Sequence, residues 1–253
     1  MTSRVSIITI INQGEREIES TICSVLGQSY PNLEYIIFDG SNTSIVAPIL
    51  KKNNAKNTRV ITGKVESTYS IMNDLSLNIT GEWVNFMNAG NTFYSKQSVE
   101  EAFKNNTSNF DIIYGDYIAK YYTKGERIIK ASLPQPPHQI QLSLQSVFAR
   151  TTTVQKILFD AHLEVAADLL FYEMCWKQKL KFHYLPLTLS VRTHHSFRQL
   201  KTPLAISEAE SVLAKFYDIK EIPRLIKSLK LRYHLMYSTG KILPAFYYRA
   251  YSN

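Results

Sequence analysis

Polar residues that could bind a ligand stand directly after three apolar, β-branched segments of the sequence. Asn12 follows VSIITII, the residues from Asp39 to Ser44 follow LEYIIF, and the residues from Asn88 to Asn91 follow WVNFM. In open α/β sheets the ligand lies beyond the carboxyl ends of the parallel strands, so these residues are candidates for one site. A carboxylate such as Asp39 could accept hydrogen bonds from a ribose or a base N–H. DG and SNT are also common turn and helix-cap sequences, and that alternative stays open.

Asp168 and Asp116 are candidates for chemistry in the second half of the chain. Asp168 follows VAA at the start of a predicted helix, where a carboxylate facing a cleft could act as general base on a sugar hydroxyl. Its structural alternative is a carboxylate bonded to the free N–H groups of the first helical turn. Asp116, within YGDY, could be a ligand at a strand end or a turn residue. Further on, Arg192 and His194 could bind a diphosphate, or His194 could bind a metal ion, although exposed loop histidines are often inert.

Several common α/β chemistries are excluded by missing motifs. The sequence lacks GxGxxG, the phosphate-loop motif, HExxH and GxSxG, which argues against dinucleotide dehydrogenases, P-loop kinases, zincins and α/β-hydrolases. Cys23 and Cys175 are too few for a disulfide framework and lack metal-ligand spacing, so a reducing cytoplasm is expected. No apolar run approaches the roughly 18 residues that a membrane-spanning helix needs, and the first residues lack the pattern of a secretory leader.

The elements that would position these residues alternate between strand and helix, which is typical of βαβ units around a parallel sheet. In the first half, strands are predicted at 5–11, 33–40, 59–62 and 82–90, and helices at 15–28, 43–54 and 67–78. Beyond residue 91 a helix near 96–104 and an antiparallel addition to the sheet at 110–122 and 126–132 are predicted. These are followed by a Pro-rich connector, a strand at 145–150, a helix at 168–178, a strand at 182–191 and two C-terminal helices.

The composition indicates a globular chain with a basic C-terminal tail. Hydrophobic residues make up 45% and charged residues 20% of the 253 residues, and the formal net charge is +8. No acidic residue follows Glu221, whereas six lysines and arginines do. From Ile222 the tail has an amphipathic helical pattern, so it could dock on the domain or lie on an anionic membrane surface. No recognised DNA- or RNA-binding module appears, so nucleic acid is not an expected partner.

Taken in order, these segments resemble the inverting family-two glycosyltransferases of bacteria, which have the GT-A fold and a nucleotide-sugar donor. The segment ESTICSVLGQSYPNLEYIIFDGSNTS is similar to that family's first helix and the strand that ends in an Asp, and STYSIMNDLSLNITGEWVNFMNAGN is similar to the stretch that follows. The later segments FDIIYGDY, LQSVFAR, FDAHLEVAADLLF and VRTHHS are similar to a family strand, an acceptor-side segment, the general-base helix and the closing loop. The resemblance covers residues 4 to about 198.

The resemblance implies an α/β GT-A (Rossmann-like) fold, with a mostly parallel central sheet flanked by helices and a C-terminal helical appendage. It divides the chain into a glycosyltransferase domain at 1–200 and a basic, aromatic tail at 201–253. The implied reaction moves a sugar from a nucleoside-diphosphate sugar, most often UDP-linked, to a hydroxyl of a surface-polysaccharide or lipid-linked oligosaccharide acceptor. The implied location is cytoplasmic, with peripheral contact at the inner face of the cell membrane.

The resemblance also assigns residues to roles. It implies Asp168 as the general base. The nucleotide-binding residues that it implies are Asn12, Asp39, Thr43, Tyr69 and Asn73. Those of the diphosphate and metal region are Asn88, Asn91, Arg192 and His194. Those of the acceptor side are Asp116, Gln145 and Ser146.

The sequence departs from the family where a divalent cation, Mn²⁺ or Mg²⁺, normally binds. Gly90 and Asn91 stand at the two Asp positions of the DXD motif, and Ser70 stands where relatives commonly have Asp. An amide oxygen is a weaker, neutral ligand than a carboxylate. Three hypotheses follow: weak metal binding through Asn91 and His194, metal-independent catalysis by basic side chains, or a nucleotide-sugar-binding protein with impaired catalysis. An active transferase ranks first.

Overall fold

The computed structural model describes residues 2–12, 17–41, 45–55, 57–105, 107–121, 125–133, 141–194 and 202–223. The strands in these ranges are β1 (Val5–Ile11), β2 (Leu33–Asp39), β3 (Thr58–Thr62), β4 (Trp83–Phe86), β5 (Thr92–Phe93), β6 (Ile112–Tyr121), β7 (Gly125–Ile129), β8 (Val147–Arg150) and β9 (Phe182–His194). The helices are α1 (Ile18–Leu26), α2 (Val46–Lys52), α3 (Thr68–Ser76), α4 (Ser98–Ala102), α5 (Thr151–Lys156), α6 (Ala167–Lys177) and α7 (Thr202–Ala214), with the 3₁₀ turn η1 (Leu144–Ser146) before β8.

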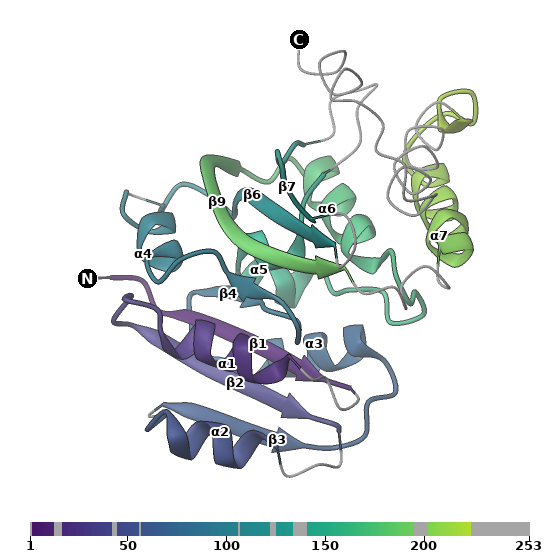
Figure 1. Ribbon diagram of the computed structural model, residues 1–253. Helices are drawn as coiled ribbons and strands as arrows, with labels where there is room; N and C mark the ends of the chain where they lie inside the picture. The colour runs from purple at the N-terminus through teal and green to yellow at the C-terminus, as the bar shows by residue number, and fades with distance from the viewer. Residues whose placement is uncertain are drawn as a thin grey trace.

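One mixed sheet runs through the described part of the chain in the order β3-β2-β1-β4-β8-β6-β9-β5, and β7 pairs with β6 (Figure 1). The first four of these strands are parallel. All seven residues of β1 are buried, as expected for a β-branched strand covered on both faces. In the register, Ile11 pairs with Asp39 and Asp39 with Thr62, so the carboxyl ends of β1, β2 and β3 meet at one edge.

The second half of the sheet contains the expected antiparallel pair, formed by β6 and β7. Strand β8 runs antiparallel to both β4 and β6, while β9 runs parallel to β6 over a long stretch. The pairing of β6 with β9 shifts register on both sides of Asp116, which marks a bulge at this residue. The α/β architecture expected for the chain is therefore present, with antiparallel pairing in its second half.

Two elements differ from the sequence-based expectations. Helix α5 starts with three threonines, which favour strands, but Val154 is fully buried and Thr151 Oγ1 donates to Gly81 O at 2.6 Å. The short strand β5 pairs with β9, which lies about one hundred residues later in the chain. Both elements depend on tertiary contacts, which local propensity does not contain.

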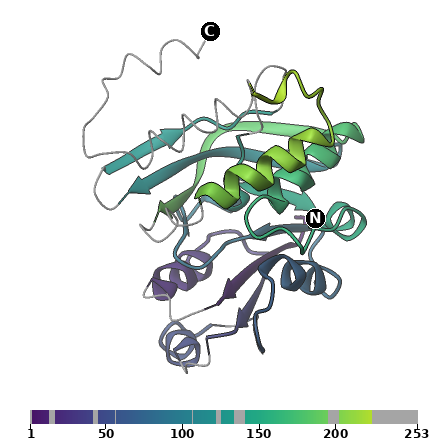
Figure 2. The same ribbon diagram turned by 90° about the vertical axis from the view of Figure 1, so that its right-hand side faces the viewer.

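Helices cover both faces of the sheet (Figure 2). On one face, apolar residues of α1, α2 and α4 pack on alternate residues of β1, including Ile7 and Ile11. On the other face, residues of α3, α5 and α6 pack on the intervening residues Ile8 and Ile10. Burying each such side chain stabilises the fold by about 1.5 to 3 kcal/mol, so these two layers hold the strand ends in place.

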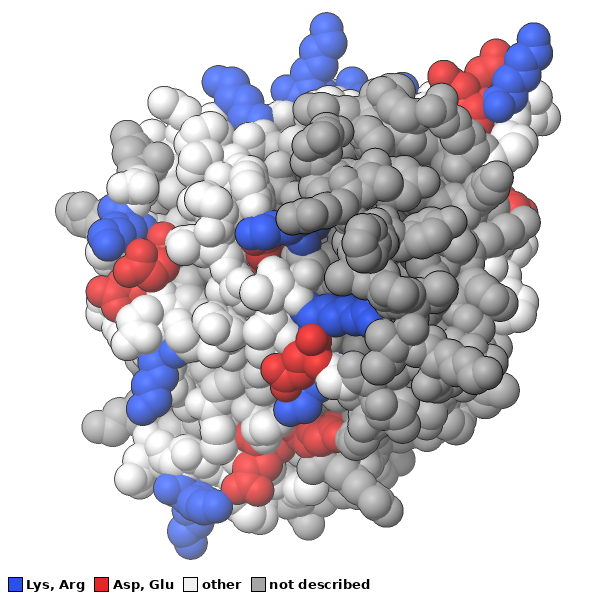
Figure 3. Space-filling view, turned by 45° about the horizontal axis from the view of Figure 1, so that its top comes forward, with Lys and Arg blue, Asp and Glu red and all other residues white. Residues whose placement is uncertain are grey.

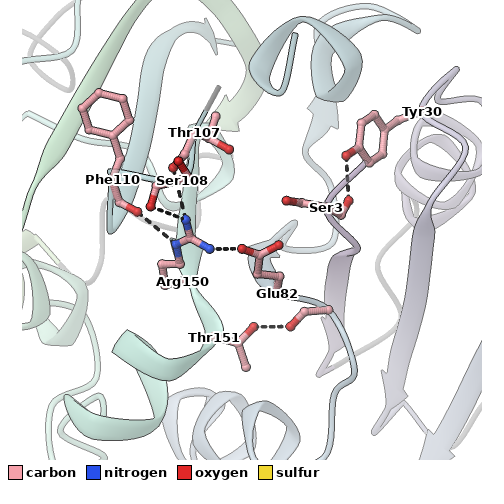
Figure 4. A network of polar contacts seen from close by, with 9 residues as sticks. Ser3, Tyr30, Glu82, Thr107, Ser108, Phe110, Arg150 and Thr151 are labelled. Atoms are coloured by element: carbon pink, nitrogen blue, oxygen red, sulfur yellow. Dashed lines mark hydrogen bonds and ion pairs between the residues drawn. The ribbon is translucent and has the colours of Figure 1, made fainter. Parts of the chain in front are cut away.

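Arg150, at the end of β8, links three separate segments of the chain (Figure 4). Its guanidinium donates to Phe110 O at 3.0 Å, Thr107 O at 3.2 Å and Ser108 O at 3.0 Å, and it forms an ion pair with Glu82. It also lies over the Trp83 ring, 4.3 Å from the centroid. This residue therefore joins β8, the start of β4 and the loop before β6.

We expect Arg150→Met to lower the free energy of unfolding by about 2 to 4 kcal/mol, because three carbonyls lose a charged donor. Arg59→Met is the matched control, since Arg59 donates to a single carbonyl at an exposed site. The two losses are measured by urea unfolding, and equal losses would contradict the linking role. The pKa of Glu82 is lowered below its ordinary value of 4.5, first by a hydrogen bond from Ser3 and then by Arg150. The stabilisation that Glu82 contributes is therefore fully present above pH 4.5 and is lost as the pH falls through the lowered pKa.

Candidate active site

Asp39 ends β2 at the edge where the parallel strands finish. Its carboxylate is 8% exposed, and its Oδ1 accepts the backbone N–H of Ser41 at 3.0 Å and the Ser41 hydroxyl at 2.6 Å. Its Oδ2 accepts no hydrogen bond from a described residue. A carboxylate held at one oxygen and open at the other is suited to accept hydrogen bonds from a ligand.

The chain after Asp39 passes close to its neighbours. Gly40 N donates to Ile11 O at 2.9 Å, and a Cβ on Gly40 would lie 2.4 Å from Val65 Cγ2. Glycine is therefore the residue that lets the ends of β1 and β2 and the segment after β3 come together. Asn12 follows β1 at this edge and is exposed. Thr43, the other predicted nucleotide-binding residue of this region, lies outside the described residues.

Helix α3 connects this edge to the segment that precedes α6. Ser67 is the N-cap, where its hydroxyl accepts Ser70 N at 3.4 Å and donates to Ala161 O at 3.2 Å. Tyr69 donates to Val165 O at 3.1 Å. The Asn73 amide bonds the backbone of Phe159 twice, at 2.8 and 2.9 Å. Tyr69 and Asn73, both predicted to bind nucleotide, are therefore engaged in fastening residues 159–165, and their contact with a nucleotide stays a prediction.

Asp168 lies in the first turn of α6, just after this fastened segment. The side chain is half-buried, and its Oδ1 accepts the N–H of Leu169 at 2.8 Å. Burial raises the pKa of Tyr172 well above its ordinary value; the negative charge of Asp168 adds to this rise, and Arg192 opposes it. Asp168 and Arg192 thus both lie within electrostatic reach of the Tyr172 hydroxyl, which is fully buried and has no hydrogen-bond partner among the described residues.

Strand β9 carries Arg192 on the face of the sheet toward Tyr172. Thr193 and Val191, on either side of it, line a hollow of about 390 Å³ together with Gly90 and Lys120. Successive side chains of a strand point to opposite faces, so Arg192 points to the other face, toward α6. This placement agrees with its effect on Tyr172. The side chain of His194 lies outside the described residues.

Asn91 is committed to the protein rather than to an open ligand site. The side chain is 4% exposed; its Nδ2 donates to Asn88 O at 3.1 Å, and its Oδ1 accepts Thr193 N at 2.9 Å. Among the described residues no group of three or more His, Cys, Asp or Glu is placed to hold a metal ion. The described side chains at the predicted Asn91 site therefore do not fit a divalent cation, which prefers several charged oxygen ligands.

The predicted acceptor-side residues are buried within the second half of the sheet. Asp116 accepts Lys130 Nζ at 2.6 Å, Ala131 N at 3.0 Å and the Tyr184 hydroxyl at 2.9 Å. Ser146 Oγ donates to Asp116 O at 3.1 Å, and Gln145 Oε1 accepts a hydroxyl at 2.8 Å. These contacts lie at the bulge of Asp116, where β6 is flanked by β9 and by the residues that follow β7. A role of these three residues in binding an acceptor stays a prediction.

Two residues of this region were not expected from the sequence. Tyr172 stands four residues after Asp168 in a predicted helix, so helical spacing could have indicated it. Glu208 accepts the backbone N–H groups of residues 164–166. It lies about forty residues later in the chain, and no sequence pattern connects it to α6.

The fold matches solved structures of glycosyltransferases. The S. aureus TarS fragment 1–349 in complex with UDP-GlcNAc is 17% identical with a TM-score of 0.65, and the match covers 93% of this chain and 73% of that chain. The mannosyltransferase PcManGT from Pyrobaculum calidifontis, in complex with GDP-Man and Mn²⁺, is 12% identical with a TM-score of 0.65, covering 99% and 79%. No family model and no curated protein sequence matches the chain. At these identities the likeness establishes the fold, and the expected GT-A class is confirmed.

We expect Asn91→Asp to raise the affinity for Mn²⁺, because a carboxylate is a stronger ligand than an amide. The same change should lower the free energy of unfolding by about 1 to 3 kcal/mol, because a carboxylate cannot donate to Asn88 O. Calorimetric Mn²⁺ titration in the presence of UDP and urea unfolding measure the two effects. Asn78→Asp, at an exposed site, is the control. Unchanged metal affinity together with unchanged stability would show that residue 91 neither takes part in metal binding nor holds the turn.

Proposed function

We propose that the chain is an inverting glycosyltransferase. It moves a sugar from a nucleoside-diphosphate sugar, with UDP as the expected nucleotide, to a hydroxyl of a surface-polysaccharide or lipid-linked oligosaccharide acceptor. The observation that carries this proposal is the connection between Asp39 and Asp168: α3 joins the edge at Asp39 to the segment before Asp168 on a glycosyltransferase fold. The complexes of TarS with UDP-GlcNAc and of PcManGT with GDP-Man support a nucleotide-sugar donor.

In the proposed reaction Asp39 holds the nucleoside through its open Oδ2. The acceptor hydroxyl oxygen attacks the anomeric carbon while Asp168 removes the hydroxyl proton. The bond from the anomeric carbon to the diphosphate oxygen breaks on the opposite face, and its electron pair leaves with the nucleoside diphosphate. A single displacement of this kind inverts the configuration at the anomeric carbon.

The surroundings of Asp168 fit a base that works next to a leaving anion. Arg192, whose charge reaches Tyr172, offsets the negative charge that develops on the diphosphate. The raised pKa of Tyr172 keeps its hydroxyl neutral throughout the physiological range, so it cannot compete with Asp168 as an anion. Burial raises the pKa of the Cys175 thiol to about 12, which makes that group unreactive.

A nucleotide-sugar-binding protein with impaired catalysis is the second candidate function. The observation that favours it is the engagement of Asn91 within the protein. Ser70, the other residue at a position where the resemblance expects Asp, also lacks a carboxylate. Both candidates bind the nucleotide, and only the transferase releases it from a sugar. Turnover therefore distinguishes them.

We expect Asp168→Asn to lower kcat about 100- to 10,000-fold, because an amide cannot accept the acceptor proton. UDP affinity should stay within about twofold of the wild type, since Asp39 is unchanged. UDP release from a panel of UDP-sugars and calorimetric titration of UDP, with Mn²⁺ and then with EDTA, measure both. Asp74→Asn, at an exposed position of α3, is the matched control.

Each other outcome has a definite meaning. Normal turnover of Asp168→Asn would refute its role as base. Binding of UDP without transfer by the wild type would favour the impaired binding protein. UDP binding that survives EDTA would assign the diphosphate to Arg192 and its basic neighbours. An absence of UDP binding in both conditions would refute the UDP-sugar donor.

We also propose contact with an anionic membrane surface through the basic tail. No helix among the described residues is both long and apolar enough to cross a membrane. Figure 3 shows basic and acidic side chains interspersed over one face, with uncharged surface between them. On the described part of that face, charge of one sign does not gather, so the proposed contact rests on residues 224–253, which lie outside the described residues.

We expect deletion of residues 224–253 to reduce binding to anionic vesicles, because the deletion removes six of the basic residues. Cosedimentation with vesicles of anionic and of neutral lipid measures the effect, and the full-length chain is the reference. Equal binding of both chains to anionic vesicles would exclude the tail as the lipid contact. An insoluble truncated chain would show instead that the tail docks on the domain.

A further inference from the structure

A carboxylate from α7 receives the backbone N–H groups that lead into the helix of Asp168. Glu208 Oε1 accepts Glu164 N at 2.8 Å, and its Oε2 accepts Val165 N and Ala166 N, both at 2.9 Å. Three N–H groups in succession thus share one acceptor group. Charge-assisted hydrogen bonds of this type are about twice as strong as neutral ones.

Helix α6 is capped incompletely by its own residues. The side chain of the N-cap residue, Ala166, cannot accept a hydrogen bond, while Asp168 Oδ1 accepts the N–H of Leu169 within the first turn. The first N–H groups of a helix have no intrahelical partner, and the helix dipole places partial positive charge there. Glu208, from another element, supplies an acceptor for the N-cap N–H of Ala166 and a negative charge at this end of the helix.

Helix α7 is held firmly enough on α6 to act in this way. Val212 is fully buried and packs with Ala166 and Leu170. Beyond α7, Lys177 Nζ donates to Phe216 O at 3.3 Å, and the Tyr217 hydroxyl donates to Glu173 at 2.9 Å. The segment 202–217 is therefore packed along the length of α6.

The peptide groups before Asp168 are consequently fixed from two sides. Tyr69 of α3 holds the carbonyl of Val165, and Glu208 of α7 holds its N–H. We propose that Glu208 is a positioning residue, which fixes residues 164–166 and so aligns the Asp168 carboxylate with the acceptor hydroxyl. This inference rests on the proposed function of Asp168 as the base.

Glu208 also sets the electrostatic surroundings of Asp168. Among the described residues, Cys175 on the same helix, Tyr69 on α3 and Arg192 on β9 act together with Asp168 on the Tyr172 hydroxyl, and Glu164 is exposed in the preceding segment. The Glu208 carboxylate neutralises the positive end of α6, next to Asp168. Its removal therefore favours the ionised form of Asp168 and makes Asp168 a weaker base.

The test compares Glu208→Gln and Glu208→Ala with Glu221→Gln, which removes an exposed carboxylate from the same region. We expect kcat to fall about 10- to 100-fold in Glu208→Ala and less in Glu208→Gln, because the amide keeps one acceptor oxygen. KM for the UDP-sugar and the Kd for UDP should stay within about twofold of the wild type. The acidic limb of the kcat profile should move about 0.3 to 0.7 pH unit lower. Glu221→Gln should match the wild type in all four.

Hydrogen exchange at the amides of residues 164–169 separates failure of this inference from failure of the proposed function. Faster exchange in Glu208→Ala, with the expected loss of kcat, supports the positioning role. Unchanged kcat in an active enzyme overturns it. Parallel losses in kcat and UDP affinity, with an unmoved pH limb, also overturn it, because they show general destabilisation. A wild type that binds UDP but transfers no sugar refutes the proposed function. The proposal that Glu208 aligns a base then fails as well, even if hydrogen exchange shows that Glu208 holds residues 164–166. If Glu208→Ala does not fold, the isosteric Glu208→Gln carries the same comparisons.

Discussion

The segment between α5 and α6 has no regular secondary structure, so side chains from distant elements must satisfy its backbone polar groups. Residues of α3 and its N-cap provide partners for Phe159, Ala161 and Val165. Glu208 of α7 provides them for residues 164–166. An unpaired buried polar group costs about 1 to 3 kcal/mol, so the part-buried bonds from Tyr69, Asn73 and Glu208 decide where the segment lies. The location of Asp168 follows from them, because α6 begins where the segment ends.

The same constraint explains why the two halves of the proposed site belong together. Asp39 is positioned by the parallel half of the sheet, and Arg192 by the mixed half. Helix α3 lies on the sheet through Ile71 and Met72, which pack against β1 and β4 residues, and it reaches the segment before Asp168 with its first turns. A shift of α3 would therefore move the proposed base relative to the proposed nucleoside carboxylate.

The turn after β4 shows how an amide can take over a place that a carboxylate usually has. The Asn91 amide donates to Asn88 O within the turn and accepts Thr193 N from β9, so it links the turn to β9. A carboxylate at this position could accept from Thr193 N but could not donate to Asn88 O. In the described residues, Asn91 therefore contributes order to the turn, and Arg192 supplies a positive charge that acts on Tyr172, as Asp168 does. This arrangement fits diphosphate stabilisation by a basic side chain.

The sequence by itself determined the alternation of strands and helices and the two-sided burial of β1 and β2. It also placed Asp39 at the end of a strand and Asp168 at the start of a helix. These features follow from local hydrophobic patterns and strand-end chemistry, which a single sequence contains. Helix α5, strand β5, the buried roles of Asp116, Gln145 and Ser146, and the engagement of Asn73 and Asn91 were decided by the tertiary structure. So was the contact of Glu208 with α6. The contacts of Asn73, Glu208 and the Asn91 carbonyl oxygen join groups dozens of positions apart in the chain, so no local pattern could indicate them.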